Sequence, residues 1–418
     1  MAARRCASLP WCCCLAWCSP PARRSSSPRP SCCSWANTGC AAGALVRTRT
    51  RAKERLGRLA SPAFFFSSLM KHEQTMRSLD DLEQAGLIPP PSPEQRAAAD
   101  AFGVLLPPAL ARLIDPSDPS DPIAAQVIPS AHERTVTPDE ISDPIGDAAH
   151  SPLPGLVHRY PDRVLLKLTG LCAVNCRFCF RRDLLTQDVL RDADLEAALA
   201  YIGAHPEVWE VILSGGDPLI LSDARLNRVV RRLEAIETVS VIRVHTRLPV
   251  ANPERVTPAL VGALKSPKAV YVMLHCNHPR ELTPEARAAC ARLIDAGLPV
   301  LSQSVLLRGV NDRPEVLEAL MRAFVATRIT PHYLHHGDMA RGTSHFRVPL
   351  ETAQALLRGL RGRLSGLGQP TYILDLPEGH GKVPVGPVFA TRDGAGWRVE
   401  DPQGEVHAYG NAGSRAIG

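Results

Sequence analysis

Short apolar runs alternate with longer stretches of helical period from Arg163 onward, and this alternation constrains the fold more than any other feature of the sequence. The runs are apolar on both faces, which is typical of strands in a parallel sheet covered by helices. Six strand–helix units predict an α/β fold, a partial (β/α)6 barrel rather than a complete eightfold one, with function at the C-terminal ends of its strands. We expect strands at 164–168, 209–213, 239–245, 269–275, 299–305 and 331–336, helices near 192–204, 223–234, 257–265, 282–296 and 314–326, and then a helix at 349–364 and a seventh strand at 371–376.

The first 69 residues differ in composition from the rest of the 418-residue chain. They hold eleven Lys and Arg against one acidic residue, contain eight of the thirteen cysteines, and show no helical or strand period. A transit-like leader and a cysteine-dense disulfide or metal segment would each fit this composition. We interpret 1–69 as a disordered, non-functional upstream extension, with the working protein starting at Met70. Three segments follow: an N-terminal helical region at 70–157 with helices near 75–86, 94–103 and 108–114, the barrel at 158–387, and a C-terminal tail at 388–418.

The formal net charge of +6 comes from the leader, because the residues after it carry 37 basic against 41 acidic side chains. A nucleic-acid partner is therefore not expected. No run of 18 apolar residues occurs, so a membrane partner is not expected either. Only five cysteines follow the leader, and three of them lie within eight residues. This clustering fits a metal site in a reducing cytoplasm better than a disulfide framework.

The segment LTGLCAVNCRFCFRR places three cysteines with C-x3-C-x2-C spacing directly after the first expected barrel strand. Cys172, Cys176 and Cys179 can each bind one iron of a [4Fe-4S] cluster, which leaves the fourth iron without a protein ligand. Such an iron can bind the amino and carboxylate groups of S-adenosylmethionine (SAM), whose reductive cleavage yields a 5′-deoxyadenosyl radical. A zinc site and inert buried cysteines are the alternatives, and zinc would need a fourth ligand from candidates such as Cys276 or Cys290.

A Gly-rich turn, LSGGDPL, ends the second expected strand. Its glycines would let the backbone approach a ligand, and the turn would place an aspartate beside the cysteine loop. Taken alone, Gly-Gly-Asp is also an ordinary turn. The cofactor-binding candidates here are Ser214, Gly215, Gly216 and Asp217.

The cysteine loop and this turn together resemble the radical S-adenosylmethionine superfamily, in which they bind the cluster and the methionyl amino group. The blocks PGLVHRYPDRVLLKL, HCNHPRE, QSVLLRGVND and GTSHFRVPL narrow the resemblance to the lysine 2,3-aminomutase family, from about Pro144 to Pro387. The resemblance implies a partial barrel of the radical SAM type. It also implies three cofactors: a [4Fe-4S] cluster, S-adenosyl-L-methionine and pyridoxal 5′-phosphate (PLP).

The family holds PLP as a Schiff base to a lysine, and LDLPEGHGKVPVGP offers Lys382 at the matching position, in a Gly-flanked loop after the last strand. The chain has 42 arginines and six lysines, so a generic positive charge here would usually be Arg. Schiff-base chemistry requires an amine, which Arg cannot supply. The alternative interpretation of Lys382 is an ordinary solvated lysine at the surface. Arg159, Tyr160 and Arg163 match family positions near the PLP phosphate, although a polar approach to the first strand would also use such residues.

The remaining candidates also come from the resemblance. Arg181 matches the arginine that binds the substrate carboxylate. Asp338 and Asp375 match the pair that holds the distal ammonium of lysine, although each alone could be a loop cap. His275 and Gln303 match residues that contact SAM. The implied activity is that of an isomerase that moves the α-amino group of L-lysine to the β-carbon and gives β-lysine, with an electron donor such as flavodoxin or ferredoxin.

The chain also departs from the family pattern. Arg313 stands where some members have a zinc-binding cysteine, and no cysteine follows Cys290. The zinc site that links subunits in those members is therefore not expected here, and whether the chain forms a homo-oligomer is left open. In this the chain is similar to the shorter members that form (R)-β-lysine for elongation factor P. Phe178 and His335 replace a histidine and a tyrosine found near PLP in some relatives. The alternatives are therefore an aminomutase of the elongation factor P type and a radical SAM enzyme without PLP.

Overall fold

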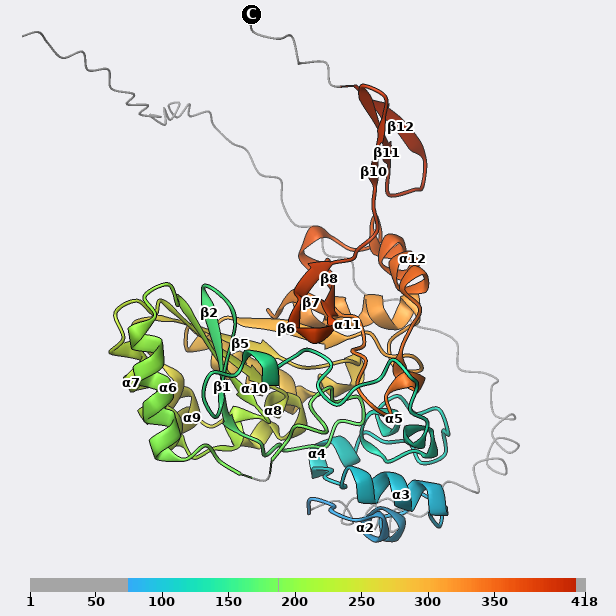
Figure 1. Cartoon of the computed structure of the whole chain (residues 1–418). Coiled ribbons are helices and arrows are strands. Elements are labelled where there is room, and N and C mark those ends of the chain that lie inside the picture. The colour runs from blue at the N-terminus through green and yellow to red at the C-terminus, as the bar shows by residue number, and fades with distance from the viewer. Residues whose placement is uncertain (1–73, 187, 411–418) are drawn as a thin grey trace, which may run out of the picture. The chain divides into compact units, whose positions relative to one another are not determined.

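The computed structural model describes residues 74–186 and 188–410, and its main element is a curved nine-stranded sheet (Figure 1). The strands lie in the sheet in chain order, and β2 to β8 all pair in parallel. Each parallel strand overlaps a segment expected to be a strand, so the predicted α/β partial barrel is confirmed. The parallel strands are β2 (Arg163–Thr169), β3 (Glu210–Gly215), β4 (Val241–Thr246), β5 (Ala269–Leu274), β6 (Val300–Val305), β7 (Thr330–His335) and β8 (Thr371–Leu376).

Some of the expectations lie outside the described residues. These are the disordered leader at 1–69 with its eight cysteines, the start at Met70 and the end of the tail at 411–418. Within the described ranges, no helix combines the length and the apolar character needed to cross a bilayer.

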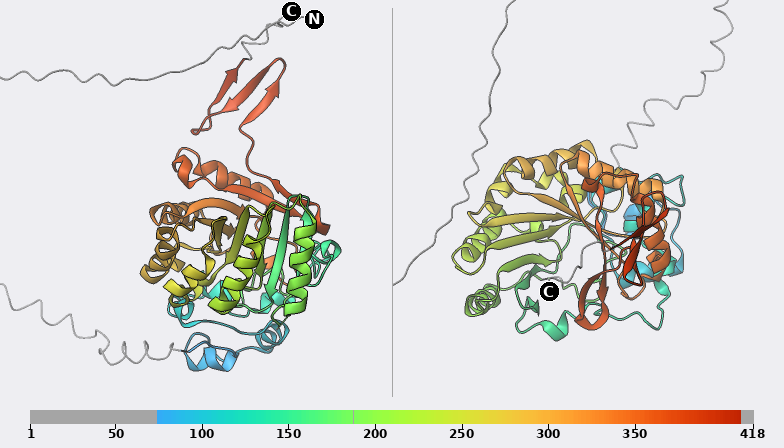
Figure 2. Two further views of the ribbon diagram at one scale, coloured as in Figure 1. Left: turned by 90° about the vertical axis from the view of Figure 1, so that its left-hand side faces the viewer. Right: turned by 90° about the horizontal axis from the view of Figure 1, so that it is seen from above.

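Helices on the outer face of the sheet connect successive parallel strands (Figure 2). Ser222, Thr257 and Thr283 each accept a hydrogen bond from a backbone amide in the first turn of a helix, so polar caps fix where these helices begin. Leucines and valines of the sheet and the helices form one large buried core. The connecting helices are α6 (Asp192–Ala204), α7 (Asp223–Glu234), α9 (Pro258–Leu264), α10 (Pro284–Asp295), α11 (Pro314–Ala326) and α12 (Leu350–Leu360).

Two antiparallel strands at the edges of the sheet were not expected from the sequence. β1 (Leu156–Tyr160) pairs with β2 and crosses the boundary expected between 157 and 158, and β9 (Gly381–Pro384) pairs with β8. Lys382 therefore lies in a strand, directly opposite Asp375, and its expected position in a loop was wrong. A separate three-stranded sheet occupies much of the segment expected as a tail: β10 (Ala390–Asp393), β11 (Gly396–Glu400) and β12 (Val406–Tyr409).

The N-terminal helical region packs against the cysteine loop. Its apolar side chains form a second buried cluster, which also includes Val174 from the cysteine loop and Ala251 from the end of α8 (Leu248–Ala251). This region is therefore part of the support for the three cysteines. Its helical segments are α2 (Leu79–Gln84), α3 (Pro93–Ala101), α4 (Pro108–Ala111), α5 (Ala124–Val127), η2 (Ala131–Arg134) and η3 (Ala148–His150).

Arg177, between the second and third cysteines, ties the loop to this region. Its side chain is fully buried, and Nε and Nη2 donate to the Glu133 carboxylate at 2.9 and 2.6 Å. Nη1 donates to the carbonyl oxygens of Phe102 and Gly103 at 2.6 and 2.8 Å. Arg182 Nη2 donates to the same Glu133 carboxylate at 2.7 Å. Because buried guanidinium groups need a counter-charge, Glu133 holds the loop in this conformation.

Replacing Glu133 by Ala should destabilise the protein by about 3–5 kcal/mol, because it leaves Arg177 buried without a counter-charge. Urea unfolding followed by circular dichroism measures the change. Asp192→Ala is the matched control, since Asp192 pairs with two arginines, Arg225 and Arg228, but is 62% exposed, and it should change the midpoint little. Equal losses in the two variants would contradict the assigned role of Glu133.

Candidate active site

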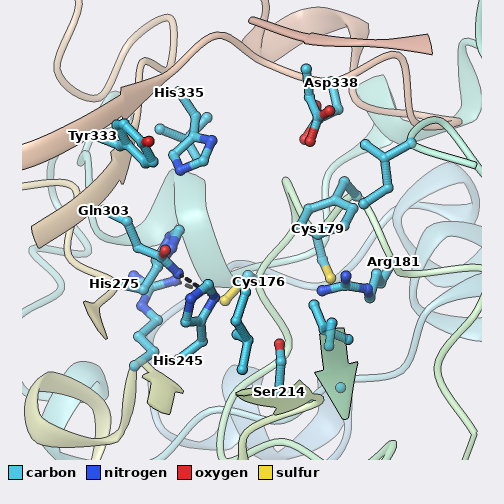
Figure 3. Close-up of a pocket in the computed structure, with 18 of the residues that line it drawn as sticks. Cys176, Cys179, Arg181, Ser214, His245, His275, Gln303, Tyr333, His335 and Asp338 are labelled. Atoms are coloured by element: carbon cyan, nitrogen blue, oxygen red, sulfur yellow. Dashed lines mark hydrogen bonds between the residues drawn. The ribbon is translucent and has the colours of Figure 1, made fainter. Parts of the chain in front are cut away.

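A cavity of about 550 Å³ extends from the C-terminal ends of the strands into the barrel. In Figure 3, Asp338 and His335 lie on the side of this cavity away from Ser214. Every residue singled out from the sequence as a site candidate lines the cavity, which brings together side chains from positions 159 to 382. They are Cys172, Cys176, Cys179, Arg159, Tyr160, Arg163, Arg181, Ser214, Gly215, Gly216, Asp217, His275, Gln303, Asp338, Asp375 and Lys382.

The three cysteine thiols of the loop are partly buried and unpaired. Burial and the neighbouring Cys179 and Asp217 raise the pKa of Cys172 well above its ordinary value, and burial together with Cys176 raises the pKa of Cys179 to about 12. Three thiolates at this place therefore need cations beside them. Among the described residues, no three His, Cys, Asp or Glu side chains converge to hold one metal ion. Cysteines that each bind a separate iron of a cubane need not converge in this way.

The Gly-rich turn packs directly on the start of the cysteine loop. The amide of Gly216 donates to the Thr169 carbonyl at 2.7 Å, and the amide of Asp217 donates to the Leu171 carbonyl at 2.8 Å. A Cβ at Gly216 would lie 2.0 Å from the Leu171 oxygen, and Gly215 has φ +111°, which side chains rarely adopt. The glycines thus permit a close approach of backbone to backbone, and the close approach of a ligand stays a prediction.

Asp217 uses its carboxylate to join the ends of β3 and β4. It accepts hydrogen bonds from the amides of Leu219 and Arg247 at 3.0 and 2.8 Å, and from the Thr246 hydroxyl at 2.8 Å. Burial raises the pKa of Asp217 in spite of these hydrogen bonds, which favour the charged form. Its side chain thus serves to position the ends of the two strands.

Lys382 lies among the groups expected to bind PLP. Its Nζ forms an ion pair with Asp375, and its backbone amide donates to the Tyr160 hydroxyl at 2.8 Å. The Arg163 guanidinium lies 3.8 Å from the centre of the Tyr160 ring, and Arg159 Nη1 lies 3.4 Å from Asp375 Oδ1. The amine of Lys382, the hydroxyl of Tyr160 and the guanidinium groups of Arg159 and Arg163 therefore lie together in this part of the cavity.

Arg181 and Asp338 present opposite charges to the same cavity. Arg181 Nε donates to Asp147 Oδ2 at 2.9 Å, and Lys167 Nζ lies 3.9 Å from the same oxygen. Burial alone would raise the pKa of Asp147, but Arg181 and Lys167 outweigh it and hold that pKa below its ordinary value. Burial raises the pKa of Asp338 to about 7, with Asp375 adding to the rise and Lys382 opposing it.

His275 and Gln303, the candidates for contact with SAM, lie on neighbouring elements of the cavity wall. The His275 ring stacks on Phe178 with the ring centres 5.4 Å apart, and burial together with Arg247 lowers its pKa to about 3, so it is neutral. Gln303 Nε2 lies 3.2 Å from Nδ1 of His245. His245 is partly buried, and burial together with Arg243 holds its pKa well below its ordinary value.

Several residues that line the cavity were missed in the sequence, among them Glu210, Arg243, His245 and Arg247. Arg243 Nε lies 2.8 Å from Glu210 Oε1, so an ion pair faces the barrel interior. The sequence of β4 could have shown this, because Arg243 and His245 are two positions apart and so share one face of the strand. The interpretation of this strand as apolar on both faces was wrong.

A family model described as the Radical SAM superfamily matches residues 166–320. The L-lysine 2,3-aminomutase of Clostridium subterminale is 43% identical over 279 residues, which cover 66% of this chain and 67% of that protein. The L-lysine 2,3-aminomutase of Acetoanaerobium sticklandii is 38% identical over 337 residues, which cover 78% of this chain and 81% of that protein. The chain belongs to the lysine 2,3-aminomutase family. The L-lysine 2,3-aminomutase of Escherichia coli K12 is 37% identical over 292 residues, or 69% of this chain and 85% of that protein.

Membership of the lysine 2,3-aminomutase family confirms the resemblance and the radical SAM type of the barrel. The chain is a radical SAM aminomutase that acts on a small molecule, and this class implies a [4Fe-4S] cluster and SAM. The residues present fit both groups, because three partly buried thiols and the Gly-rich turn lie together at the ends of β2 and β3. The roles of the individual residues stay predictions.

Gly216→Ala should prevent a radical SAM aminomutase of this design from holding its cluster. The new Cβ would lie 2.0 Å from the Leu171 carbonyl oxygen, so the cysteine loop must move. We expect a loss of stability of about 1–3 kcal/mol and iron and sulfide contents well below those of the wild type after anaerobic reconstitution. Gly203→Ala is the control, because no atom lies within 4 Å of its added Cβ, and it should stabilise α6 by about 0.5–1 kcal/mol. Full cluster content in Gly216→Ala would refute this role of the turn.

Proposed function

We propose that the protein is an L-lysine 2,3-aminomutase, a PLP-dependent isomerase that moves the α-amino group of lysine to the β-carbon and releases β-lysine. One observation carries the proposal: the cavity lined by the three cysteines also contains Lys382, whose amine pairs with Asp375. Among the described residues, Lys382 is the only lysine in this cavity. In this proposal the cluster cysteines, which supply the radical source, and the amine of Lys382 line the same cavity. An amino shift by radical chemistry requires both.

The residues around Lys382 fit PLP. Arg159, Arg163 and Tyr160 supply cations and a hydroxyl suited to a phosphate dianion. When bound, PLP supplies an aldehyde that condenses with amines and a conjugated ring that delocalises an unpaired electron. The Tyr160 hydroxyl accepts a hydrogen bond from the backbone amide of Lys382, and Asp375 forms an ion pair with the Lys382 side chain. Asp375 Oδ1 is buried and accepts no hydrogen bond within the described residues, so it has capacity for a further donor.

The charges in the cavity support lysine as the amino acid. Arg181 donates one hydrogen bond to Asp147 through Nε, and its two Nη groups can hold a substrate carboxylate in bidentate geometry. Asp338 and Asp375 then provide carboxylates for the distal ammonium. A substrate with an acidic side chain would add a third negative charge there and be rejected.

Reconstitution of the full chain under anaerobic conditions tests the proposal. With PLP, SAM, dithionite and lysine, the wild type should form β-lysine, and borohydride should fix a pyridoxyl group to the peptide that contains Lys382. Lys382→Ala should lose both signals but keep its cluster, because Lys382 makes no contact with the cysteines among the described side-chain hydrogen bonds. Arg292→Gln, on the outer helix α10, is a control that should retain both signals.

Other outcomes separate the alternatives. A cluster that cleaves SAM without any pyridoxyl adduct would favour a radical SAM enzyme without PLP. Turnover with (R)-β-lysine as the product would favour an aminomutase of the elongation factor P type. Failure to form β-lysine with all cofactors bound would contradict the proposed reaction.

Lysine binding should weaken as the pH falls below about 7, the pKa to which burial raises Asp338. Only the ionised carboxylate attracts an ammonium group, and its fraction falls about tenfold for each pH unit below the pKa. We therefore expect KM for lysine to rise about fivefold between pH 7 and pH 6, and about tenfold for the next pH unit. Asp338→Asn should raise KM at pH 8 and flatten this dependence. An unchanged pH profile in Asp338→Asn would show that another group titrates.

A further inference from the structure

Arg247 is a buried cation that contacts one of the three cluster cysteines. It follows β4 directly, and its side chain is 5% exposed. Its Nη1 donates to Cys176 Sγ at 2.9 Å. The backbone amide of Arg247 donates to Asp217 at 2.8 Å, so the Gly-rich turn fixes the start of this side chain.

The guanidinium of Arg247 is held from two further directions. Its Nη2 donates to Glu281 Oε2 and to Gln126 Oε1, both at 2.8 Å. Glu281 is fully buried, and its other carboxylate oxygen accepts hydrogen bonds from the amides of Asn277 and His278 at 3.0 and 2.9 Å. Burial would lower the pKa of Arg247, but Cys176 and Glu281 outweigh burial and raise it, so the cation persists.

We infer that Arg247 is a positioning residue that sets the reduction potential of the cluster, and that Glu281 limits its effect as a buried counter-charge. Hydrogen bonds to the sulfurs, net charge and burial are the factors by which a protein sets the potential of an iron–sulfur cluster. Reduction brings one electron from an external one-electron donor into the cluster and needs no proton. The added negative charge is stabilised by Arg247 and destabilised by Glu281, because both lie in a poorly solvated place.

The N-terminal helical region takes part in this arrangement through Gln126 of α5. Gln126 accepts from Arg247 and from Asn277, and its own backbone carbonyl accepts from the amide of Arg177 in the cysteine loop at 2.8 Å. The same helix therefore orients both the loop and the cation beside it. The potential of the cluster would then depend on a region that contributes no ligand.

Two variants of the full chain should shift the potential in opposite directions. Arg247→Gln removes the cation and should make reduction less favourable by tenfold or more, a shift of about 59 mV or more to negative values for one electron. Glu281→Gln removes the counter-charge and should shift the potential to less negative values. Arg292→Gln is the matched control. Among the described residues, the Arg292 side chain donates only to the backbone carbonyls of Val256 and Pro253, so the potential should not change.

A redox titration followed by electron paramagnetic resonance measures the potentials of the wild type and the three variants, reconstituted without SAM, PLP or lysine. Iron content and circular dichroism show which variants fold and hold the cluster. If Arg247→Gln loses its cluster, the direction of the shift in Glu281→Gln tests the inference. Equal potentials, or shifts of one sign in both variants, would overturn the inference. An effect of Arg247→Gln confined to SAM affinity would also overturn it. The inference uses the cluster alone, so its outcome is independent of PLP binding and of lysine as the substrate.

Discussion

The contact between the Gly-rich turn and the start of the cysteine loop is the interaction on which the site depends. Two backbone hydrogen bonds, from Gly216 to Thr169 and from Asp217 to Leu171, join the end of β3 to the loop after β2. No side chain fits between these backbones, because a Cβ at Gly216 would clash with the Leu171 oxygen. The direction in which the cysteines face the cavity is therefore fixed by main-chain geometry. The Asp217 carboxylate also accepts a hydrogen bond from the amide of Arg247, which holds the end of β4 against the same turn.

The antiparallel pairing of β8 with β9 provides the second constraint. It adds the edge strand β9 to the sheet and sets Lys382 opposite Asp375. A lysine in a strand has a defined direction, whereas a lysine in an open loop would have to be ordered on binding. The cavity that contains the three cysteines and Lys382 is also lined by rings and charges from β3 to β7, which agrees with the proposed reaction on one small molecule.

Much of the fold was predictable from the sequence, because the parallel strands are apolar, the helices have polar caps at their starts, and the two patterns alternate. The site residues were found through motif resemblance rather than periodicity. β1 and β9 were missed because they are short and flanked by Gly and Pro, which are typical of turns. The network around Arg247 could not be predicted, since Gln126 lies 121 residues away in sequence and only the folded chain brings the two together. Nothing in the segment LSGGDPL indicates that the Asp217 carboxylate accepts hydrogen bonds from the backbone amides of Leu219 and Arg247.

The central claim is the proposed function, in which a radical derived from SAM takes a hydrogen from lysine in the cavity that also contains Lys382. Incubation of the reconstituted enzyme with lysine deuterated at the β-carbon, followed by mass spectrometry of recovered SAM, tests this claim most directly. We expect deuterium to appear in the 5′-methylene group of SAM, and the labelled SAM to pass it on to product when unlabelled lysine replaces the deuterated lysine. SAM that stays free of deuterium while β-lysine accumulates would contradict the account.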